Sequence, residues 1–407
     1  MDLESRTQSA MIQTPLLLPS NQTKANTEDN KRLILPFTLD NRSLLEDYIT
    51  SITEIRENAH LLLSQPVQII DLQSIASSSY SATKIVYVLQ GEVAHVSTQG
   101  LLLSDQSTTC HILAIHSTSY RIHSSVTDDE HSTAKVIGSL CHLDAPHIYK
   151  SCIDKIIQTH FDSHRTKGDD YTPLKISFTF HLMGGYLDPQ GLSKDISNDI
   201  LGTLIEMTIH WDKMIQSHSH NLSIQWKLAT CAITSLNTIS IMNNTSPSQK
   251  VLSPRGRGLA LDVSSGKVFL VKMSSDSLYC DSIVPMYILR HTRLWFQKQS
   301  HPLTLIHTID DDDLLNISPF QFFPSSRTAF LLSLEKDPPQ LLKYTSTSPE
   351  CEETEYCDHV IQTLRFIHEV SSSSVFGIQQ GRVKGLQYQW MSGAWKRIMK
   401  GIVVRRF

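Results

Sequence analysis

One cysteine lies in a sequence context that could support nucleophilic catalysis. Cys110 follows Thr108 and Thr109 and precedes His111 at the start of the apolar run 112–115. The pattern predicts a thiol at the end of a β-strand, beside main-chain N–H groups and hydroxyls that could stabilise an oxyanion. By spacing alone, a single cysteine is more often a small buried hydrophobic residue, so the catalytic interpretation needs a partner base.

His142 is the base that we expect to work with this thiol. It lies 32 residues after Cys110 in the string Leu140-Cys141-His142-Leu143-Asp144. A cysteine and a histidine far apart in sequence but adjacent in space form the usual thiolate–imidazolium pair. His123 is the competing base if the intervening loop folds differently. Asp144 has two possible roles, because it could orient the imidazole or cap the helix that follows.

The other polar motifs do not predict a metal or cofactor site. The nineteen histidines show no zinc-binding spacing, and the acidic run 310–313 lacks the glycine and glutamate of a calcium-binding loop. Gly184-Gly185 follows a predicted strand but has neither a dinucleotide fingerprint nor a phosphate-binding lysine. We therefore expect neither a metal nor a cofactor.

Apolar periodicity predicts the elements that would position these residues. Alternation and short apolar runs predict strands, whereas spacings of three and four predict helices. The expected strands are 85–89, 101–103, 110–116, 176–182, 227–233, 259–263, 267–271 and 303–306, and the expected helices are 42–63, 144–164, 193–211 and 358–370. Strands and helices mix without strict alternation, which favours a layered α+β fold with largely antiparallel sheets.

Composition limits the class of protein. The chain has 407 residues, a formal net charge of −4 and 40% hydrophobic residues, so it can fill a sizeable core and is not built for polyanion binding. No nucleic-acid partner is expected. Residues 1–30 lack the apolar core of a secretory signal, and no stretch has the roughly 18 apolar residues needed to cross a bilayer. Seven cysteines, an odd number, fit reduced thiols better than a disulfide framework.

The sequence divides into three parts. Residues 1–30 are polar and aperiodic and predict a disordered leader, residues 31–390 hold the periodic segments of one catalytic domain, and residues 391–407 form a basic tail. Such a short tail could touch acidic partners, but it is more often a solvated end.

Several motifs together resemble those of the protein N-terminal asparagine amidohydrolase family. The string 104–112 resembles the family's nucleophile segment, 140–144 its Leu-Thr-His-x-Asp segment, and 180–186 its His-Leu-x-Gly-Gly-Phe stretch. Residues 86–94, 230–234, 258–261 and 346–349 also match in the same order, so the resemblance covers about 33–370. The leader, a longer loop between Cys110 and His142 and the basic C-terminal extension depart from it.

The resemblance implies a fold and an activity. The family is similar to cysteine-histidine glutamine deamidases, which implies an α/β/β sandwich. It implies a hydrolase that converts an N-terminal Asn of a protein to Asp, releasing ammonia through a thioester on Cys110, with His142 as acid and base. The product would feed the N-degron pathway of ubiquitin-dependent degradation. A related protein-glutamine deamidase and a non-catalytic peptide-binding member of the fold are the alternatives.

The implied substrate sets requirements for the rest of the site. The expected partners are proteins or peptides with a free N-terminal Asn. We expect the enzyme to be a monomer located in the cytoplasm, with the nucleus as a second location. Thr108 and Thr109 are expected beside the oxyanion. Asp105 and Glu92 are the candidates for binding the α-ammonium, although Asp105 could equally be a turn residue and Glu92 a hairpin residue beside Gly91.

Overall fold

A computed structural model gives the fold of most of the chain. It describes residues 44–71, 83–121, 135–145, 149–165, 174–218, 221–242, 250–274, 286–296, 303–309, 314–376 and 385–391, together with the short strands at 12–14, 16–17, 33–35, 378–379, 382–383 and 394–398. All statements below refer to these residues.

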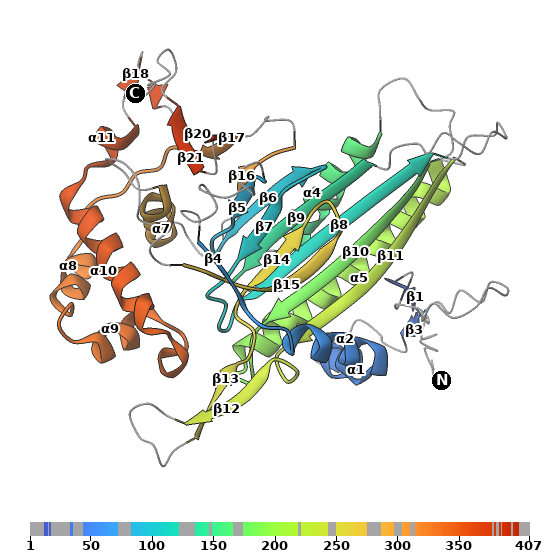
Figure 1. The fold of residues 1–407 in the computed structure, drawn as a ribbon, viewed down its shortest axis with the longest axis horizontal. Helices are drawn as coiled ribbons and strands as arrows, with labels where there is room; N and C mark the ends of the chain where they lie inside the picture. Colours follow the sequence, from blue (N-terminus) through green and yellow to red (C-terminus); the bar gives the residue numbers. More distant parts are fainter. Residues whose placement is uncertain are drawn as a thin grey trace, which may run out of the picture.

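A ten-stranded sheet forms the centre of the molecule (Figure 1). In spatial order its strands are β2 (Leu16–Leu17), β11 (Leu222–Ile233), β10 (Leu174–Gly184), β8 (His111–Arg121), β9 (Lys135–Leu143), β6 (Glu92–Ser97), β16 (Thr304–His307), β17 (Leu314–Ile317), β20 (Leu386–Met391) and β21 (Ala394–Ile398). The pairings β10–β11, β11–β2 and β6–β16 are parallel, and the others are antiparallel.

A smaller five-stranded sheet packs against one face of the large sheet. Its order is β4 (Gln68–Ile70), β15 (Lys267–Met273), β14 (Leu259–Asp262), β7 (Leu101–Ser104) and β5 (Ile85–Tyr87). The predicted hairpin is confirmed as β14 and β15, but β4 and β5 both join the sheet in parallel. The expectation of largely antiparallel sheets therefore holds for the large sheet, whereas the small sheet is evenly mixed. Two-stranded ribbons pair β1 (Ile12–Thr14) with β3 (Leu33–Leu35), β12 (Thr238–Met242) with β13 (Lys250–Pro254), and β18 (Ile378–Gln379) with β19 (Arg382–Val383).

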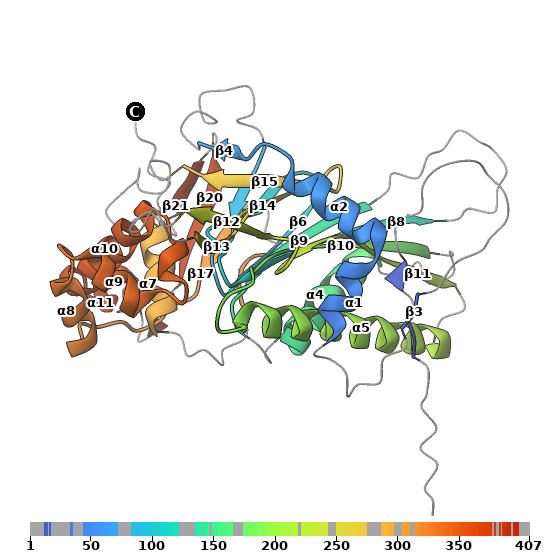
Figure 2. The ribbon, with the colours of Figure 1, turned by 90° about the horizontal axis from the view of Figure 1, so that it is seen from below.

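Helices cover the opposite face of the large sheet. Figure 2 shows α4 (Tyr149–His164) and α5 (Leu192–His218) on one side of the long strands, with β4 and β15 on the other. Two further helices, α1 (Leu45–Ser51) and α2 (Thr53–Leu63), precede β4 in the chain. The single helix predicted over 42–63 is thus two helices, which separate where Ile52 adopts an extended conformation.

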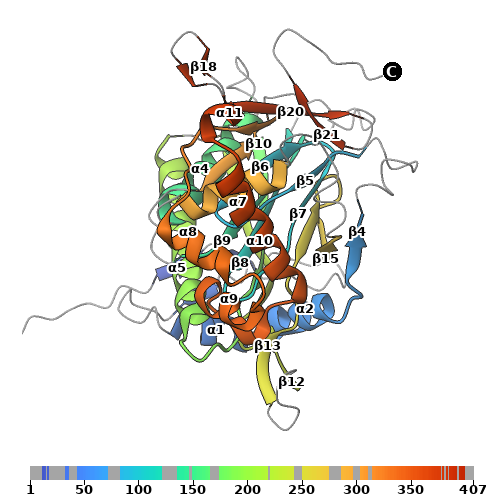
Figure 3. The ribbon, with the colours of Figure 1, turned by 90° about the vertical axis from the view of Figure 1, so that its left-hand side faces the viewer.

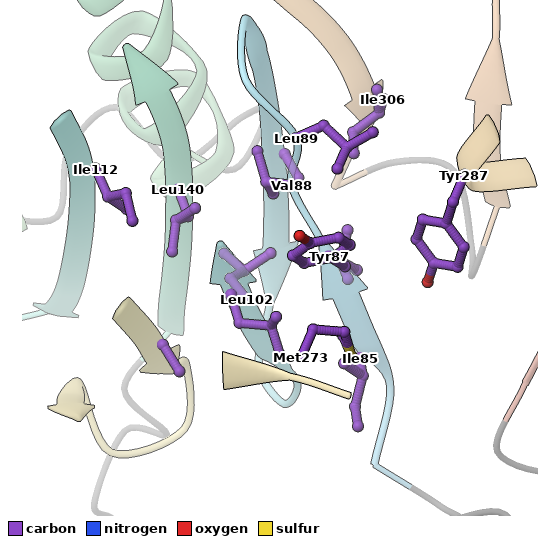
Figure 4. Packing of buried hydrophobic residues seen from close by; sticks show 14 of the residues in the cluster. Ile85, Tyr87, Val88, Leu89, Leu102, Ile112, Leu140, Met273, Tyr287 and Ile306 are labelled. Atoms are coloured by element: carbon purple, nitrogen blue, oxygen red, sulfur yellow. The ribbon is translucent and has the colours of Figure 1, made fainter. Parts of the chain in front are cut away.

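Side-chain alternation in the long strands explains this layering. In β8, Leu113 and Ile115 belong to the apolar cluster beneath the helices, whereas Ile112 and Ala114 belong to the cluster shared with the small sheet. Figure 4 shows the second cluster, where Ile112 and Leu140 face Leu102 across the two sheets. Successive side chains of a strand point to opposite faces, so a strand buried on both sides carries apolar residues on both of them.

A helical lobe packs at one end of the sandwich (Figure 3). It contains α7 (Met286–Phe296), α8 (Ser326–Ser333), α9 (Pro338–Thr345), the 3₁₀ turn η3 (Pro349–Cys351), α10 (Thr354–Glu369) and α11 (Ser372–Phe376). Its own apolar cluster centres on Leu331, Leu341 and Leu364. None of the described helices is long and apolar enough to cross a membrane.

The structure modifies three of the sequence expectations. The short strands β1 and β2 lie within the predicted leader 1–30. Strand β21 lies within the predicted tail 391–407 and pairs with β20, and Trp395 is buried and donates to the Ile85 carbonyl at 2.7 Å. Sheet structure therefore extends beyond both boundaries of the predicted catalytic domain. The third difference is strand β13, which lies between the expected strands 227–233 and 259–263 where no strand was expected.

Buried histidines and serines form a hydrogen-bonded chain between the large sheet and α4. His95 contacts Ser139 at 2.6 Å, and Ser139 contacts His160 of α4 at 2.5 Å. Ser117 then joins His160 to His164, both at 2.7 Å. Burial lowers the pKa of His95 and His164 from 6.5 to about 4, and it lowers the pKa of His160 further. These imidazoles are therefore neutral in the folded protein at neutral pH.

This chain predicts a loss of stability on acidification. The unfolded histidines bind protons near pH 6.5, whereas the folded ones resist protonation until about pH 4, so stability present above pH 6.5 is lost as the pH falls through that range. We expect the Tm, measured by circular dichroism, to fall less between pH 7 and pH 5 in His160→Gln than in the wild type. His60→Gln, at an exposed position of α2, should behave like the wild type. An unchanged pH dependence in His160→Gln would contradict this assignment.

Candidate active site

Cys110 lies in the segment between β7 and β8, directly before the first residue of β8. Its side chain is half-buried, whereas Cys141, Cys152, Cys231, Cys351 and Cys357 are buried. Its carbonyl accepts hydrogen bonds from the Gly185 N–H at 2.8 Å and the Ser107 hydroxyl at 2.5 Å. The main chain at the thiol is therefore fixed while the sulfur retains some exposure.

Two glycines at the end of β10 permit this close contact. Gly184 pairs with His111 in the sheet, and a Cβ at Gly184 would lie 2.3 Å from the Cys110 carbonyl oxygen. Gly184 also has a φ of +135°, which side chains rarely adopt. A Cβ at Gly185 would lie 2.7 Å from the His111 ring. The Gly184-Gly185 motif thus makes room for the main chain of the nucleophile segment.

Hydroxyl groups connect the thiol to the helical lobe. Thr109 is buried, its hydroxyl hydrogen-bonds the Cys110 side chain, and it contacts the Thr347 hydroxyl at 3.0 Å. Thr347 lies between α9 and η3, 238 residues further along the chain. Thr108 is buried as well. The lobe therefore contacts the residue immediately before the nucleophile.

The ring of His142 is buried and held by one hydrogen bond. His142 lies in β9 opposite Ile112, and its Nδ1 contacts the Ser104 hydroxyl of β7 at 2.8 Å. The side chain is 3% exposed, and its Nε2 atom has no hydrogen-bond partner. Burial lowers the pKa of His142 to about 4, with the nearby Glu92 acting in the opposite direction. The free Nε2 is available to a reacting group.

His142 and Cys110 lie near the same end of the β8–β9 pair. His142 is directly opposite Ile112, and Cys110 lies two residues before Ile112, just outside β8. The two side chains are not hydrogen-bonded to each other in this structure, so their catalytic pairing stays a prediction. His123, the competing base, lies outside the described residues.

Burial and two carboxylates disfavour the thiolate. Burial raises the pKa of Cys110 most, the negative charges of Asp144 and Glu352 raise it further, and the Thr109 hydrogen bond lowers it. The imidazole of His142 also resists protonation. A thiolate–imidazolium pair, which the sequence predicted as the working form, is therefore not the favoured resting state of this site.

Asp144 lies close to the thiol and does not orient the imidazole. Its Oδ2 accepts a hydrogen bond from the Gln90 side chain at 2.8 Å, whereas the His142 Nδ1 contacts Ser104. Helix α4 begins at Tyr149, so Asp144 is not the cap of that helix either. Neither of the two roles considered from the sequence matches this placement.

The two predicted ammonium-binding carboxylates are both occupied by the protein itself. Asp105 accepts hydrogen bonds from the Tyr87 hydroxyl and, at 2.6 Å, from the Met273 N–H, and burial raises its pKa to about 6. Glu92 is buried between Arg290 and Arg293 of α7 and pairs with both guanidinium groups. These arrangements argue against Asp105 and Glu92 as substrate-binding residues, because their oxygens are already satisfied.

Comparisons with known proteins identify the family. The sequence profile of the family described as protein N-terminal asparagine amidohydrolase matches residues 75–397. The chain belongs to this family. Among curated proteins, the protein N-terminal asparagine amidohydrolase of Sus scrofa is 24% identical over 365 residues, which cover 87% of this chain and 94% of the relative. The Homo sapiens protein of the same name is 23% identical over 362 residues, 86% of this chain and 93% of the relative.

The amidohydrolase match includes residues that sequence reasoning did not select. Glu352, Thr347 and Ser104 all surround the two predicted catalytic residues. Thr347 lies within the segment 346–349, which resembles a family motif, and Glu352 follows that motif closely. The motif was therefore the sequence signal from which both residues could have been identified. No group of three or more His, Cys, Asp or Glu side chains in the described part of the chain could hold a metal ion.

Replacement of Gly184 tests the packing of the nucleophile segment. We expect Gly184→Ala to lower both the free energy of unfolding and the activity, because the new Cβ would collide with the Cys110 carbonyl. Gly191→Ala is the matched control, since Gly191 also has a positive φ (+74°) but nothing lies within 4 Å of its Cβ position. The control should lose only about 1 kcal/mol from backbone strain. Equal losses in urea-denaturation experiments would show that the contact with Cys110 is unimportant.

Proposed function

We propose that this protein hydrolyses the side-chain amide of an N-terminal asparagine in protein or peptide substrates, producing an N-terminal aspartate and ammonia. The observation that carries the proposal is a half-buried thiol, Cys110, directly before the end of β8 that pairs with the His142 end of β9, together with a His142 Nε2 that has no hydrogen-bond partner. Membership of the amidohydrolase family supports the identity of the substrate. The α/β/β layering agrees with the cysteine-histidine deamidase fold that we propose for the domain.

The reaction would proceed in two stages. The Cys110 sulfur attacks the carboxamide carbon, and the tetrahedral intermediate collapses to a thioester as the C–N bond breaks and ammonia leaves with a proton from His142. A water molecule, deprotonated by His142, then attacks the thioester carbonyl. The C–S bond breaks, the thiol is regenerated, and the product chain begins with aspartate. No step requires a metal or a cofactor.

The resting protonation states favour general-base catalysis over a preformed ion pair. Because Cys110 is a neutral thiol and His142 a neutral imidazole, the proton would move from sulfur to Nε2 as the sulfur attacks. In the neutral ring, an Nδ1–H that donates to Ser104 leaves the lone pair on Nε2. Ser104 would therefore fix the tautomer. The N–H groups around Thr109 and Cys110, with the Thr108 hydroxyl, are the proposed oxyanion donors.

The product defines the proposed biological role. An N-terminal aspartate would direct the substrate into the N-degron pathway of ubiquitin-dependent degradation, and we propose the cytoplasm, with the nucleus as a second location, as the place of action. A protein-glutamine deamidase would use the same two residues, and a non-catalytic peptide-binding protein would use neither. Substrate chemistry distinguishes the three.

The first test is ammonia release from matched peptides. Wild-type protein should release ammonia from a peptide that starts with Asn, and not from one that starts with Gln or with acetylated Asn. Cys110→Ala should abolish release, whereas Cys141→Ala, at a buried thiol on the helix side of the sheet, should retain it. Release from the Gln or acetylated peptide would move the protein to the broader deamidase class, and no release from any peptide would favour the binding protein.

The base is tested separately. We expect His142→Ala to reduce kcat about 100-fold or more, because a positioned acid and base typically contributes that much. His60→Ala, at an exposed position of α2, is the control and should leave kcat unchanged. Turnover within a factor of two of the wild type in His142→Ala would remove His142 from the mechanism.

A further inference from the structure

Two carboxylates that the mechanism does not use lie beside the nucleophile. Asp144 follows β9, and continuation of the β8–β9 register places it opposite Cys110, since His111 pairs with Leu143. Glu352 follows η3 in the helical lobe, and its Oε1 accepts a hydrogen bond from the Ser346 hydroxyl at 2.5 Å. Ser346 adjoins Thr347, which contacts Thr109 beside the thiol. The two acidic groups thus reach the sulfur from different parts of the chain.

Other residues occupy only one oxygen of each carboxylate, and Asp144 also accepts from its own main-chain N–H. Asp144 uses Oδ2 for Gln90, and Glu352 uses Oε1 for Ser346. The remaining oxygen of each accepts no hydrogen bond from another residue in the described part of the structure. Both side chains are half-buried, and burial raises the pKa of both. Partly buried carboxylates without a direct cationic partner are costly unless a ligand supplies the positive charge.

The nearby protein charges do not neutralise this site. Arg257 is the cation close to Glu352, but its guanidinium donates to the Cys351 carbonyl and, at 3.1 Å, to the Ser253 hydroxyl. Tyr356 of α10 donates its hydroxyl to the Thr345 carbonyl at 2.7 Å and remains neutral, because burial raises its pKa. His142, two residues before Asp144, has a buried Nε2 without a hydrogen-bond partner, which is a position for a ligand atom.

We propose that Asp144 and Glu352 together bind the α-ammonium of the substrate, and that the positive charge they hold beside Cys110 promotes formation of the thiolate. This inference rests on the proposed function and explains its selectivity for a free N-terminus. Without a cation, the two negative charges oppose ionisation of the thiol. With the ammonium bound, they are neutralised, and proton transfer to His142 becomes easier. An acetylated or internal Asn brings no charge, so it would be both poorly bound and poorly activated.

The proposal predicts changes of opposite sign in two measurements. Glu352→Gln and Asp144→Asn should each increase the rate of Cys110 alkylation by iodoacetamide at pH 7 severalfold, since each removes a negative charge beside the sulfur. The same variants should lower kcat/KM for an Asn-starting peptide about tenfold or more, the typical effect of losing a charged hydrogen bond. A purely structural role would leave the wild type without a response to a small ammonium compound, which the next experiment measures. Glu353→Gln is the matched control, because Glu353 pairs with Lys272 at 2.6 Å instead, and it should change neither rate.

A small amine separates this inference from the proposed function. Glycinamide carries an α-ammonium without a side chain, so it should accelerate alkylation of the wild type but not of the Asp144→Asn/Glu352→Gln double variant, and acetylglycinamide should have no effect. Unchanged or slower alkylation in the single variants, or equal acceleration of wild type and double variant by glycinamide, would overturn the inference. If the wild type releases no ammonia from any peptide, the proposed function fails, while the alkylation results still decide whether this cation site exists.

Discussion

Two guanidinium groups of one helix meet a single buried carboxylate, and the arrangement of the site depends on this ion cluster. Arg290 and Arg293 of α7 both pair with Glu92 at the start of β6, and the adjacent Gly91 donates to the His142 carbonyl at 2.9 Å. Removing one partner from a buried cluster of this kind costs about 3 to 5 kcal/mol. The contact therefore fixes the helical lobe to the turn before β6 that supports the main chain of His142.

The site is assembled from two bodies with different roles. The sandwich supplies the imidazole of His142 and the hydroxyl of Ser104 from strands, and the thiol of Cys110 from the residue directly before β8. The lobe supplies Thr347 and Glu352 from the turn between α9 and α10. Rigid strands hold the reacting groups, whereas the lobe contributes the charge and the hydroxyl that adjust the thiol. Changes in the lobe could thus alter selectivity without altering the chemistry.

Sequence patterns predicted many of the elements, but neither β6 and β9 nor the charges around the thiol. The β14–β15 hairpin, β10 and α5 follow from turn residues and from apolar spacing, which are local properties of the chain. In the lobe only α10 was predicted, although the capping box formed by Ser325 and Thr328 marks the start of α8, and Asp337 before two prolines marks the start of α9. Glu92 and Asp105 contact Arg290 and Met273, which are more than 160 residues distant, so no local pattern reveals these contacts. Glu352 influences the thiol from the distant lobe, and only the neighbouring 346–349 motif pointed to that segment.

The hydrogen bond between Thr109 and Thr347 has a consequence for the newly synthesised chain. The two residues are separated by 238 positions, and the lobe folds around a cluster that includes α10 near the end of the domain. Because domains form as their chain emerges during synthesis, this contact cannot form until the ribosome has made the segment that contains Thr347. A truncated product that ends before Thr347 would therefore carry Cys110 without this contact from the lobe.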